Sequence, residues 1–290
     1  MPKGILLKGQ KGLYAVYDGE KEVQCRAGSR LRKGDMRLSP GDEVEYTLNS
    51  DGTGFITEIL PRRNAFVRPP VANIDAFVIV TAAASPDPDI FYLDSLCTIA
   101  TLAGAEVMLV INKTDIASPE YLKSIYEKTP VKVFCVQAVN GVGIEPLRQA
   151  LKGKTAVFAG PSGAGKSSLL NALCPTLSAQ VGDLSQRLMR GKNTTRVSEL
   201  FMLDGDIRLA DTPGFTMLDF AACGVTDHKT VIEAFPEMLP FTENCRWRDC
   251  AHTVEEGCAV IQAVKDGKVP VSRHESFVRI YTEVKQNTTY

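Results

Sequence analysis

The sequence predicts a multi-domain protein with an N-terminal β-barrel, a central α/β domain and a C-terminal, mostly helical region. Three observations support this order. Short β-rich segments fill residues 1–65, wholly apolar segments alternate with helical stretches over residues 66–222, and strand-like segments stop before residues 223–290. Because a change in hydrophobic period marks a change in architecture, we expect three domains with these boundaries.

The bulk composition is that of a water-soluble globular protein. The chain has 290 residues, of which 44% are hydrophobic and 23% charged, and its formal net charge is -1. Any nucleic-acid contact must therefore come from a local basic patch. The sequence shows no signal peptide, no run of roughly 18 apolar residues and no coiled-coil repeat. We accordingly expect a cytoplasmic monomer without membrane contact.

The first region predicts a small barrel. Residues 13–17, 42–48 and 54–60 are β-rich and are separated by glycine-containing turns. A closed barrel removes exposed sheet edges, and a five-stranded oligonucleotide-binding barrel (OB-fold) fits the length. A basic stretch in this region is either an RNA-binding patch or a solvated loop. Its members are Arg26, Arg30, Arg32, Lys33 and Arg37.

The second region predicts a parallel sheet. Arg62-Arg63 and Arg68-Pro69-Pro70 are typical of a linker. Fully apolar strands that alternate with helices are typical of a parallel sheet covered on both faces. The predicted strands are residues 76–82, 106–111, 131–136 and 155–159, with a helix at 90–102.

Local signals add further elements. A helix is expected to begin with Ser118 as its N-cap and Pro119 at its first position. Residues 201–203 and 207–210 flank an Asp-Gly-Asp turn and predict a hairpin. The C-terminal region should contain helices at 227–235, 259–265 and 272–284.

A phosphate-binding loop (P-loop) pattern lies in the central domain. The segment 160–167 reads GPSGAGKS, follows a predicted strand and opens a predicted helix. The glycines let backbone N–H groups turn toward phosphates, Lys166 should reach the β- and γ-phosphates, and Ser167 should ligate Mg²⁺. The competing interpretation is a glycine-rich turn. The predicted binding residues are Gly160, Pro161, Ser162, Gly163, Ala164, Gly165, Lys166, Ser167 and Ser168.

Two later segments suit the same site. Asp211 opens the segment DTPG after an apolar strand, where it can orient Mg²⁺ through a water, and Gly214 can offer its N–H to the γ-phosphate. In the polar loop before them, Thr195 is the first candidate, and Thr194 the second, to reach Mg²⁺ and the γ-phosphate. A plain turn and an ordinary surface loop are the competing interpretations.

An Asn-Lys-x-Asp segment predicts the choice of base. The Asp115 carboxylate can accept hydrogen bonds from guanine N1–H and the N2 amine, and adenine offers no such pair of donors. The backbone N–H of Ala138, after the next strand, can meet the guanine oxygen, although the segment there lacks the usual serine. The predicted base-binding residues are Asn112, Lys113, Thr114, Asp115 and Ala138.

These motifs run in a rotated order. The base reader precedes the P-loop, whereas most GTP-binding proteins have the P-loop first. The same pocket can form if the usual termini are joined, here through residues 141–154, and the chain is cut elsewhere. The cut leaves the switch segments, which are the Thr-Thr loop and DTPG, next to the C-terminal region. We therefore expect an order–disorder change of these segments on loss of the γ-phosphate to move the C-terminal region.

A cysteine- and histidine-rich loop predicts a metal site. Three thiolates and one imidazole suit a closed tetrahedral Zn²⁺ site that organises a loop with little core of its own. The competing interpretation is unliganded thiols. The predicted ligands are Cys245, Cys250, His252 and Cys258.

Taken together, the barrel, NKTD, GPSGAGKS, the Thr-Thr loop, DTPG and the Cys-x4-Cys-x-His-x5-Cys spacing resemble one family over essentially the whole chain. This is the RsgA family (YjeQ/YloQ) of circularly permuted small-ribosomal-subunit biogenesis GTPases. The resemblance implies an OB-fold barrel, a permuted P-loop GTPase domain and a zinc-bearing helical domain. It further implies late maturation of the small (30S) subunit, contact with 16S rRNA, and hydrolysis of GTP to GDP that the subunit stimulates.

The chain departs from this family at one position. The family usually has histidine before the Thr-Thr pair, implicated in handling the attacking water, and this chain has Asn193. Phe215 stands where many GTPases have a water-orienting glutamine. An apolar residue at this position is what the family leads one to expect. An amide can orient water but cannot carry its proton. Asn193 is therefore either a weak water-orienting residue or a polar loop residue without a catalytic part.

Two other functions compete with GTP hydrolysis. A P-loop ATPase or small-molecule kinase is disfavoured by NKTD. A non-enzymatic, GTP-dependent rRNA-binding scaffold stays open because of Asn193.

Overall fold

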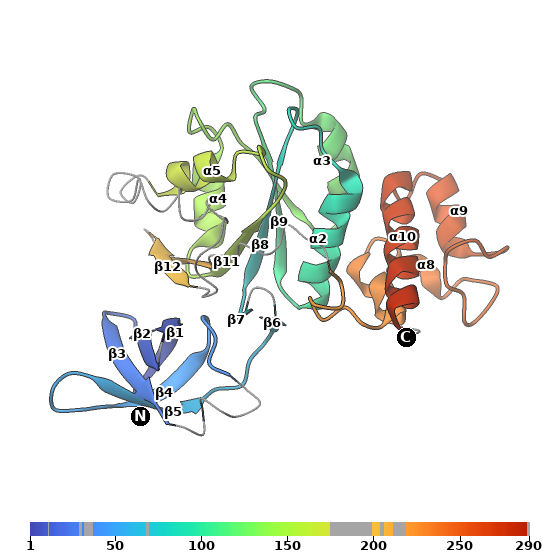
Figure 1. Cartoon of the computed structure of the whole chain (residues 1–290). Coiled ribbons are helices and arrows are strands. Elements are labelled where there is room, and N and C mark those ends of the chain that lie inside the picture. Colours follow the sequence, from blue (N-terminus) through green and yellow to red (C-terminus); the bar gives the residue numbers. More distant parts are fainter. Residues whose placement is uncertain are drawn as a thin grey trace. The chain divides into compact units, whose positions relative to one another are not determined.

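The computed structural model describes residues 1–10, 12–28, 31, 37–67, 70–174, 199–203, 206–210 and 219–288 (Figure 1). Two compact units make up the chain. One contains residues 1–76, 149–158 and 174–215, and the other contains residues 77–148, 159–173 and 216–290.

The N-terminal residues form a closed five-stranded barrel with strand order β1-β2-β3-β5-β4. Only β3 and β5 run parallel; the other neighbours are antiparallel. Inward residues alternate with outward ones, and Leu6, Val16, Tyr46 and Ile56 fill the interior. The predicted five-stranded barrel is confirmed. The strands are β1 (Lys3–Gln10), β2 (Leu13–Tyr17), β3 (Glu22–Ala27), β4 (Glu43–Leu48) and β5 (Gly54–Ile59).

The described residues after the barrel form a short sheet rather than a plain linker, and Arg68 and Pro69 of the predicted linker lie outside them. Strands β6 (Ala65–Val67) and β7 (Pro70–Ala72) pair in a two-stranded antiparallel sheet. Just before it, Arg62 donates to the buried Asp42 carboxylate at 2.6 and 2.9 Å. The linker prediction was therefore incomplete, because runs of three residues carry too little periodicity to be recognised.

The central sheet has the order β10-β9-β8-β11-β13-β12. The pairs β9–β10 and β11–β13 are parallel, and β12 pairs antiparallel with β13 as the edge hairpin. Every residue of β8 is buried, as a covered parallel sheet requires. The predicted parallel sheet and hairpin are confirmed. The strands are β8 (Ala76–Ala82), β9 (Glu106–Asn112), β10 (Lys132–Cys135), β11 (Thr155–Ala159), β12 (Leu200–Leu203) and β13 (Ile207–Ala210).

Among the described residues, four helices accompany this sheet: α2 (Ile90–Leu102), α3 (Glu120–Tyr126), α4 (Ile144–Leu151) and α5 (Lys166–Leu173). The predicted cap of α3 was wrong by one residue. Its first helical hydrogen bond runs from the Lys123 N–H to the Pro119 carbonyl at 3.0 Å, which makes Pro119 the N-cap. Ser118 lies outside the helix, and its Oγ accepts from the Glu120 N–H at 3.4 Å.

The C-terminal region is helical, as predicted. The 3₁₀ helix η1 (His228–Ala234) is followed by α8 (Leu239–Thr242), α9 (Ala259–Lys265) and α10 (Val271–Thr288). The helix predicted at 227–235 is thus 3₁₀ rather than α. Within the part of the chain that the structure describes, no helix combines the length and the apolar character needed to cross a membrane.

Candidate functional site

The P-loop connects β11 to α5, the strand–loop–helix context that the motif requires. Gly160 has φ +139°, and a Cβ on this residue would lie 2.0 Å from the Val80 carbonyl oxygen. Only glycine fits there, because the loop passes directly over β8. Lys166 donates to the Gly160 and Pro161 carbonyls at 2.8 Å each, and burial lowers its pKa. Phosphate oxygens would have to replace these carbonyls as its acceptors.

The base reader meets the P-loop through one buried side chain. Asn112, the last residue of β9, donates from Nδ2 to the Ala164 carbonyl at 3.0 Å, and its Oδ1 accepts from the Ala138 N–H at 3.0 Å. A Cβ on Gly165 would lie 2.2 Å from Asn112 Nδ2, so the loop needs glycine here too. Three segments far apart in sequence therefore converge on Asn112. The Ala138 N–H, expected to meet guanine, is already engaged by Asn112.

The rest of the NKTD segment is held by its neighbours. Lys113 has φ +61°, and its Nζ donates to the Ser85 carbonyl. Thr114 binds the Val136 carbonyl through its N–H at 3.3 Å and its Oγ1 at 3.2 Å. The Asp115 side chain is exposed. Sequence reasoning missed Ser85, because no motif marks the loop after β8.

A cleft of about 640 Å³ lies beside these motifs. Its lining includes Ala138 and Asn140 together with Ser168 and Asn171 of α5. It therefore adjoins both the turn predicted to meet the base and the first turn of the P-loop helix. The remaining predicted residues of the site, Asn193, Thr194, Thr195, Asp211 and Gly214, lie outside the described residues.

Removing the Asn112 side chain should destabilise the protein. Asn112→Ala leaves one buried N–H and one carbonyl without partners, and we expect the free energy of unfolding to fall by about 2–4 kcal/mol. Urea unfolding measures this. Asn140→Ala is the matched control, because Asn140 is exposed on the adjacent turn; its effect should stay below about 0.5 kcal/mol. Equal effects of the two variants would contradict the bridging role.

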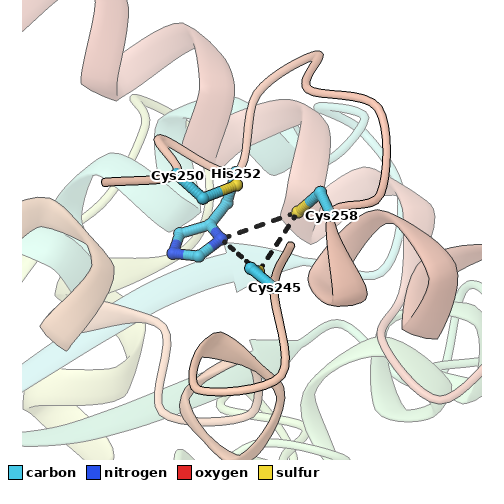
Figure 2. A group of neighbouring side chains, drawn as sticks. All are labelled: Cys245, Cys250, His252 and Cys258. Atoms are coloured by element: carbon cyan, nitrogen blue, oxygen red, sulfur yellow. Dashed lines mark hydrogen bonds between the residues drawn. The ribbon is translucent and has the colours of Figure 1, made fainter. Parts of the chain in front are cut away.

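The cysteine- and histidine-rich loop gathers its four predicted ligands into one cluster (Figure 2). Their ligand atoms all lie within 4.8 Å of one another. Cys245 Sγ lies 3.4 Å from His252 Nδ1 and 3.8 Å from Cys258 Sγ, and Cys258 Sγ lies 3.6 Å from His252 Nδ1. A tetrahedral ion with Zn–S of about 2.3 Å and Zn–N of about 2.0–2.1 Å would give about 3.8 Å between sulfurs and about 3.5 Å from sulfur to nitrogen. The donor set therefore fits a zinc ion.

Electrostatics and local contacts support the same interpretation. Burial raises the pKa of the Cys250 and Cys258 thiols and lowers that of His252, and a bound cation would stabilise the thiolate forms against this burial. The loop is shaped by the Glu255 carboxylate, which accepts from the Ala251, Thr253 and Val254 N–H groups at 2.9–3.0 Å. His274 of α10 contacts the His252 carbonyl at 2.8 Å. Spacing alone did not reveal Glu255 or His274.

Comparison with protein families gives two matches. Residues 59–221 match the model of the RsgA GTPase, and residues 3–56 match that of the RsgA N-terminal domain. The chain belongs to the RsgA GTPase family. The family accounts for the GTPase motifs and for the barrel that precedes them.

RsgA relatives match over the full length. The small ribosomal subunit biogenesis GTPase RsgA of Alkaliphilus metalliredigens is 36% identical, with 100% of each chain covered. The protein of the same name from Moorella thermoacetica is 38% identical, with 97% of each chain covered.

Two solved RsgA-type structures share the fold. YjeQ from Thermotoga maritima superposes with a TM-score of 0.82 at 30% identity, covering 98% of each chain. YloQ, described as a circularly permuted GTPase, gives a TM-score of 0.82 at 28% identity, covering 99% of this chain and 96% of its own. The permuted motif order predicted from the sequence is thereby confirmed.

Proposed function

We propose that this GTPase acts in late maturation of the small (30S) ribosomal subunit, where it binds 16S rRNA and hydrolyses GTP to GDP and phosphate with stimulation by the subunit. The Asn112 bridge carries the nucleotide part of the proposal, because it holds the base reader against the P-loop. The names of the full-length relatives support the ribosomal part. The protein would work as a cytoplasmic monomer.

The chemistry follows from the residues of the motifs. Asp115 would accept from guanine N1–H and the N2 amine, and Lys166 would neutralise the β- and γ-phosphates. Ser167 and Thr195 would ligate Mg²⁺, Asp211 would orient it through water, and the Gly214 N–H would bind the γ-phosphate. Attack by water on the γ-phosphoryl group is then assisted by charge stabilisation rather than by a covalent intermediate.

The proposed domains divide this work. Residues 1–65 form the rRNA-binding barrel, residues 66–222 the permuted GTPase domain, and residues 223–290 the zinc-binding helical domain. Cys245, Cys250, His252 and Cys258 would hold one structural Zn²⁺, since four protein ligands fill a tetrahedral site and leave no position open for catalysis.

GTP hydrolysis with purified small subunits, large subunits and neither tests the proposal. We expect small subunits to raise the rate at least about tenfold, because a partner that completes a GTPase site gives effects of this size or larger. Large subunits should leave the rate unchanged. GTP-dependent binding to small subunits without phosphate release would instead favour the rRNA-binding scaffold.

Asn193 offers a second test, by single-turnover hydrolysis with small subunits present. Asn193→Ala should slow hydrolysis a few-fold, because it removes a water-orienting amide. Asn193→His should raise the rate by about tenfold, because imidazole can also carry a proton near neutral pH. Unchanged rates in both variants would remove Asn193 from the mechanism.

A further inference from the structure

A buried ionic cluster joins the C-terminal helix α10 to the central domain. Arg273, the third residue of α10, is 1% exposed. Its Nη1 donates to Asp94 of α2 at 2.6 Å, and its Nε donates to Glu237 at 2.7 Å. The guanidinium also lies 4.4 Å from the centre of the Phe235 ring. Neither the P-loop nor the metal cluster contains these residues.

Asp94 receives a second buried donor from α3, the helix that follows the base reader in the sequence. The Tyr126 hydroxyl, at the end of α3, donates to Asp94 Oδ1 at 2.8 Å. Helix α3 begins five residues after Asp115, at the end of the loop that follows the NKTD segment. One carboxylate therefore ties α2, α3 and α10 together. Figure 1 shows α10 running beside α2.

Helix α2 in turn holds a loop of the nucleotide site. The loop 83–89 leads directly into α2, and Asp89 caps the helix by accepting from the Tyr92 N–H at 3.1 Å. Within this loop the Ala83 N–H donates to the Asn112 carbonyl at 2.8 Å, and the Ser85 carbonyl accepts from Lys113. Ser85 has φ +52°, a conformation that a non-glycine residue adopts only when its surroundings hold it.

The same loop reaches the P-loop. A Cβ on Gly163 would lie 3.5 Å from Pro86 Cδ, so the proline ring packs against this glycine. Phe91, the second residue of α2, is covered by Arg279 of α10, whose guanidinium lies 3.6 Å from the ring centre. Contacts thus run without a break from α10 through α2 to both nucleotide-binding motifs.

We propose that Arg273 and Asp94 are positioning residues that let α10 hold the loop 83–89 against Lys113 and the P-loop, so that guanine nucleotide binding and the docking of α10 stabilise each other. Such coupling is reciprocal. Bound nucleotide must raise the docking equilibrium constant of α10 by the same factor by which docked α10 raises the affinity for nucleotide. This route passes through α2 and does not require the switch segments. It rests on the proposed nucleotide-binding roles of Lys113 and the P-loop.

The test compares Asp94→Asn with Asp42→Asn in the full-length protein. Both remove the charge of a fully buried aspartate paired with arginine, but Asp42 lies in the barrel. The probe is fluorescent mant-GDP. We expect Asp94→Asn to raise the Kd about fivefold or more, the lower range of typical allosteric coupling, and Asp42→Asn to change it less than about twofold.

A second measurement separates coupling from simple destabilisation. In the wild type, GDP should slow hydrogen–deuterium exchange in residues 271–280 of α10, and this nucleotide dependence should disappear in Asp94→Asn. If that variant does not fold, Arg279→Gln replaces it, because Arg279 is exposed and its loss removes the contact with Phe91.

The inference is wrong if GDP does not change hydrogen–deuterium exchange in α10 of the wild type, or if the Kd is unchanged in a folded Asp94 or Arg279 variant. Either result leaves the proposed function standing. Failure of the wild type to bind mant-GDP would overturn the proposed function as well.

Discussion

Replacing Asp115 with asparagine should lower the affinity for GDP by about a hundredfold or more, because a site that pairs with a polar group discriminates strongly when the partner is mismatched. Asparagine would set its amide donor or single acceptor against two guanine donors. Xanthine has a carbonyl in place of the guanine N2 amine, so the same variant should gain affinity for xanthosine diphosphate. Competition against mant-GDP measures both changes.

Asp51→Asn is the control for this experiment, because Asp51 is an exposed aspartate in a barrel turn. It should leave both affinities unchanged. An Asp115→Asn protein that keeps wild-type GDP affinity would show that the NKTD segment does not choose the base. Displacement of GDP by ATP from the wild type would revive the ATPase interpretation.

Removing one ligand of the metal cluster should abolish zinc binding and melt the loop around it. Cys258→Ala leaves three donors, and a structural zinc site contributes about 10–16 kcal/mol of apparent binding free energy that local folding depends on. We expect zinc content to fall from about one ion per chain to under about a tenth. Residues 245–258 should become sensitive to protease.

Cys223→Ala provides the comparison, because Cys223 is a free cysteine in the same region and outside the cluster. It should retain its zinc and its resistance to protease, whereas a chelator should reproduce the Cys258→Ala result. Full zinc content in Cys258→Ala, or none in the wild type, would contradict the assignment.

Elements with a clear period were predictable from sequence. The apolar strands of the central sheet, the edge hairpin and α2 were expected within a residue or two of where they lie. Strands β1 and β3 were not, because KGILLKGQ and EVQCRA lack a sustained run of β-branched residues. They become strands by pairing around the closed barrel, which is a long-range effect.

The candidate site divides in the same way. Cys245 to Cys258 lie within one short segment, so their spacing alone predicted the cluster that the fold assembles. The Asn112 contact with Ala164 joins residues that are 52 positions apart, and no spacing rule predicts it. Motif chemistry predicted that the two loops share a ligand, but not which side chain holds them together.

By itself, the sequence determined the family, the rotated motif order and the ligand types, because these depend on residue identity at short range. Only the tertiary structure decided that Asp94 and Arg273, 179 positions apart, meet in the interior, and that Ser85 faces Lys113. A buried ion pair needs surroundings that add further hydrogen bonds, and here Tyr126 donates to Asp94 while Glu237 accepts from Arg273. Those surroundings come from α2, α3 and α10 packing together, which no single segment encodes.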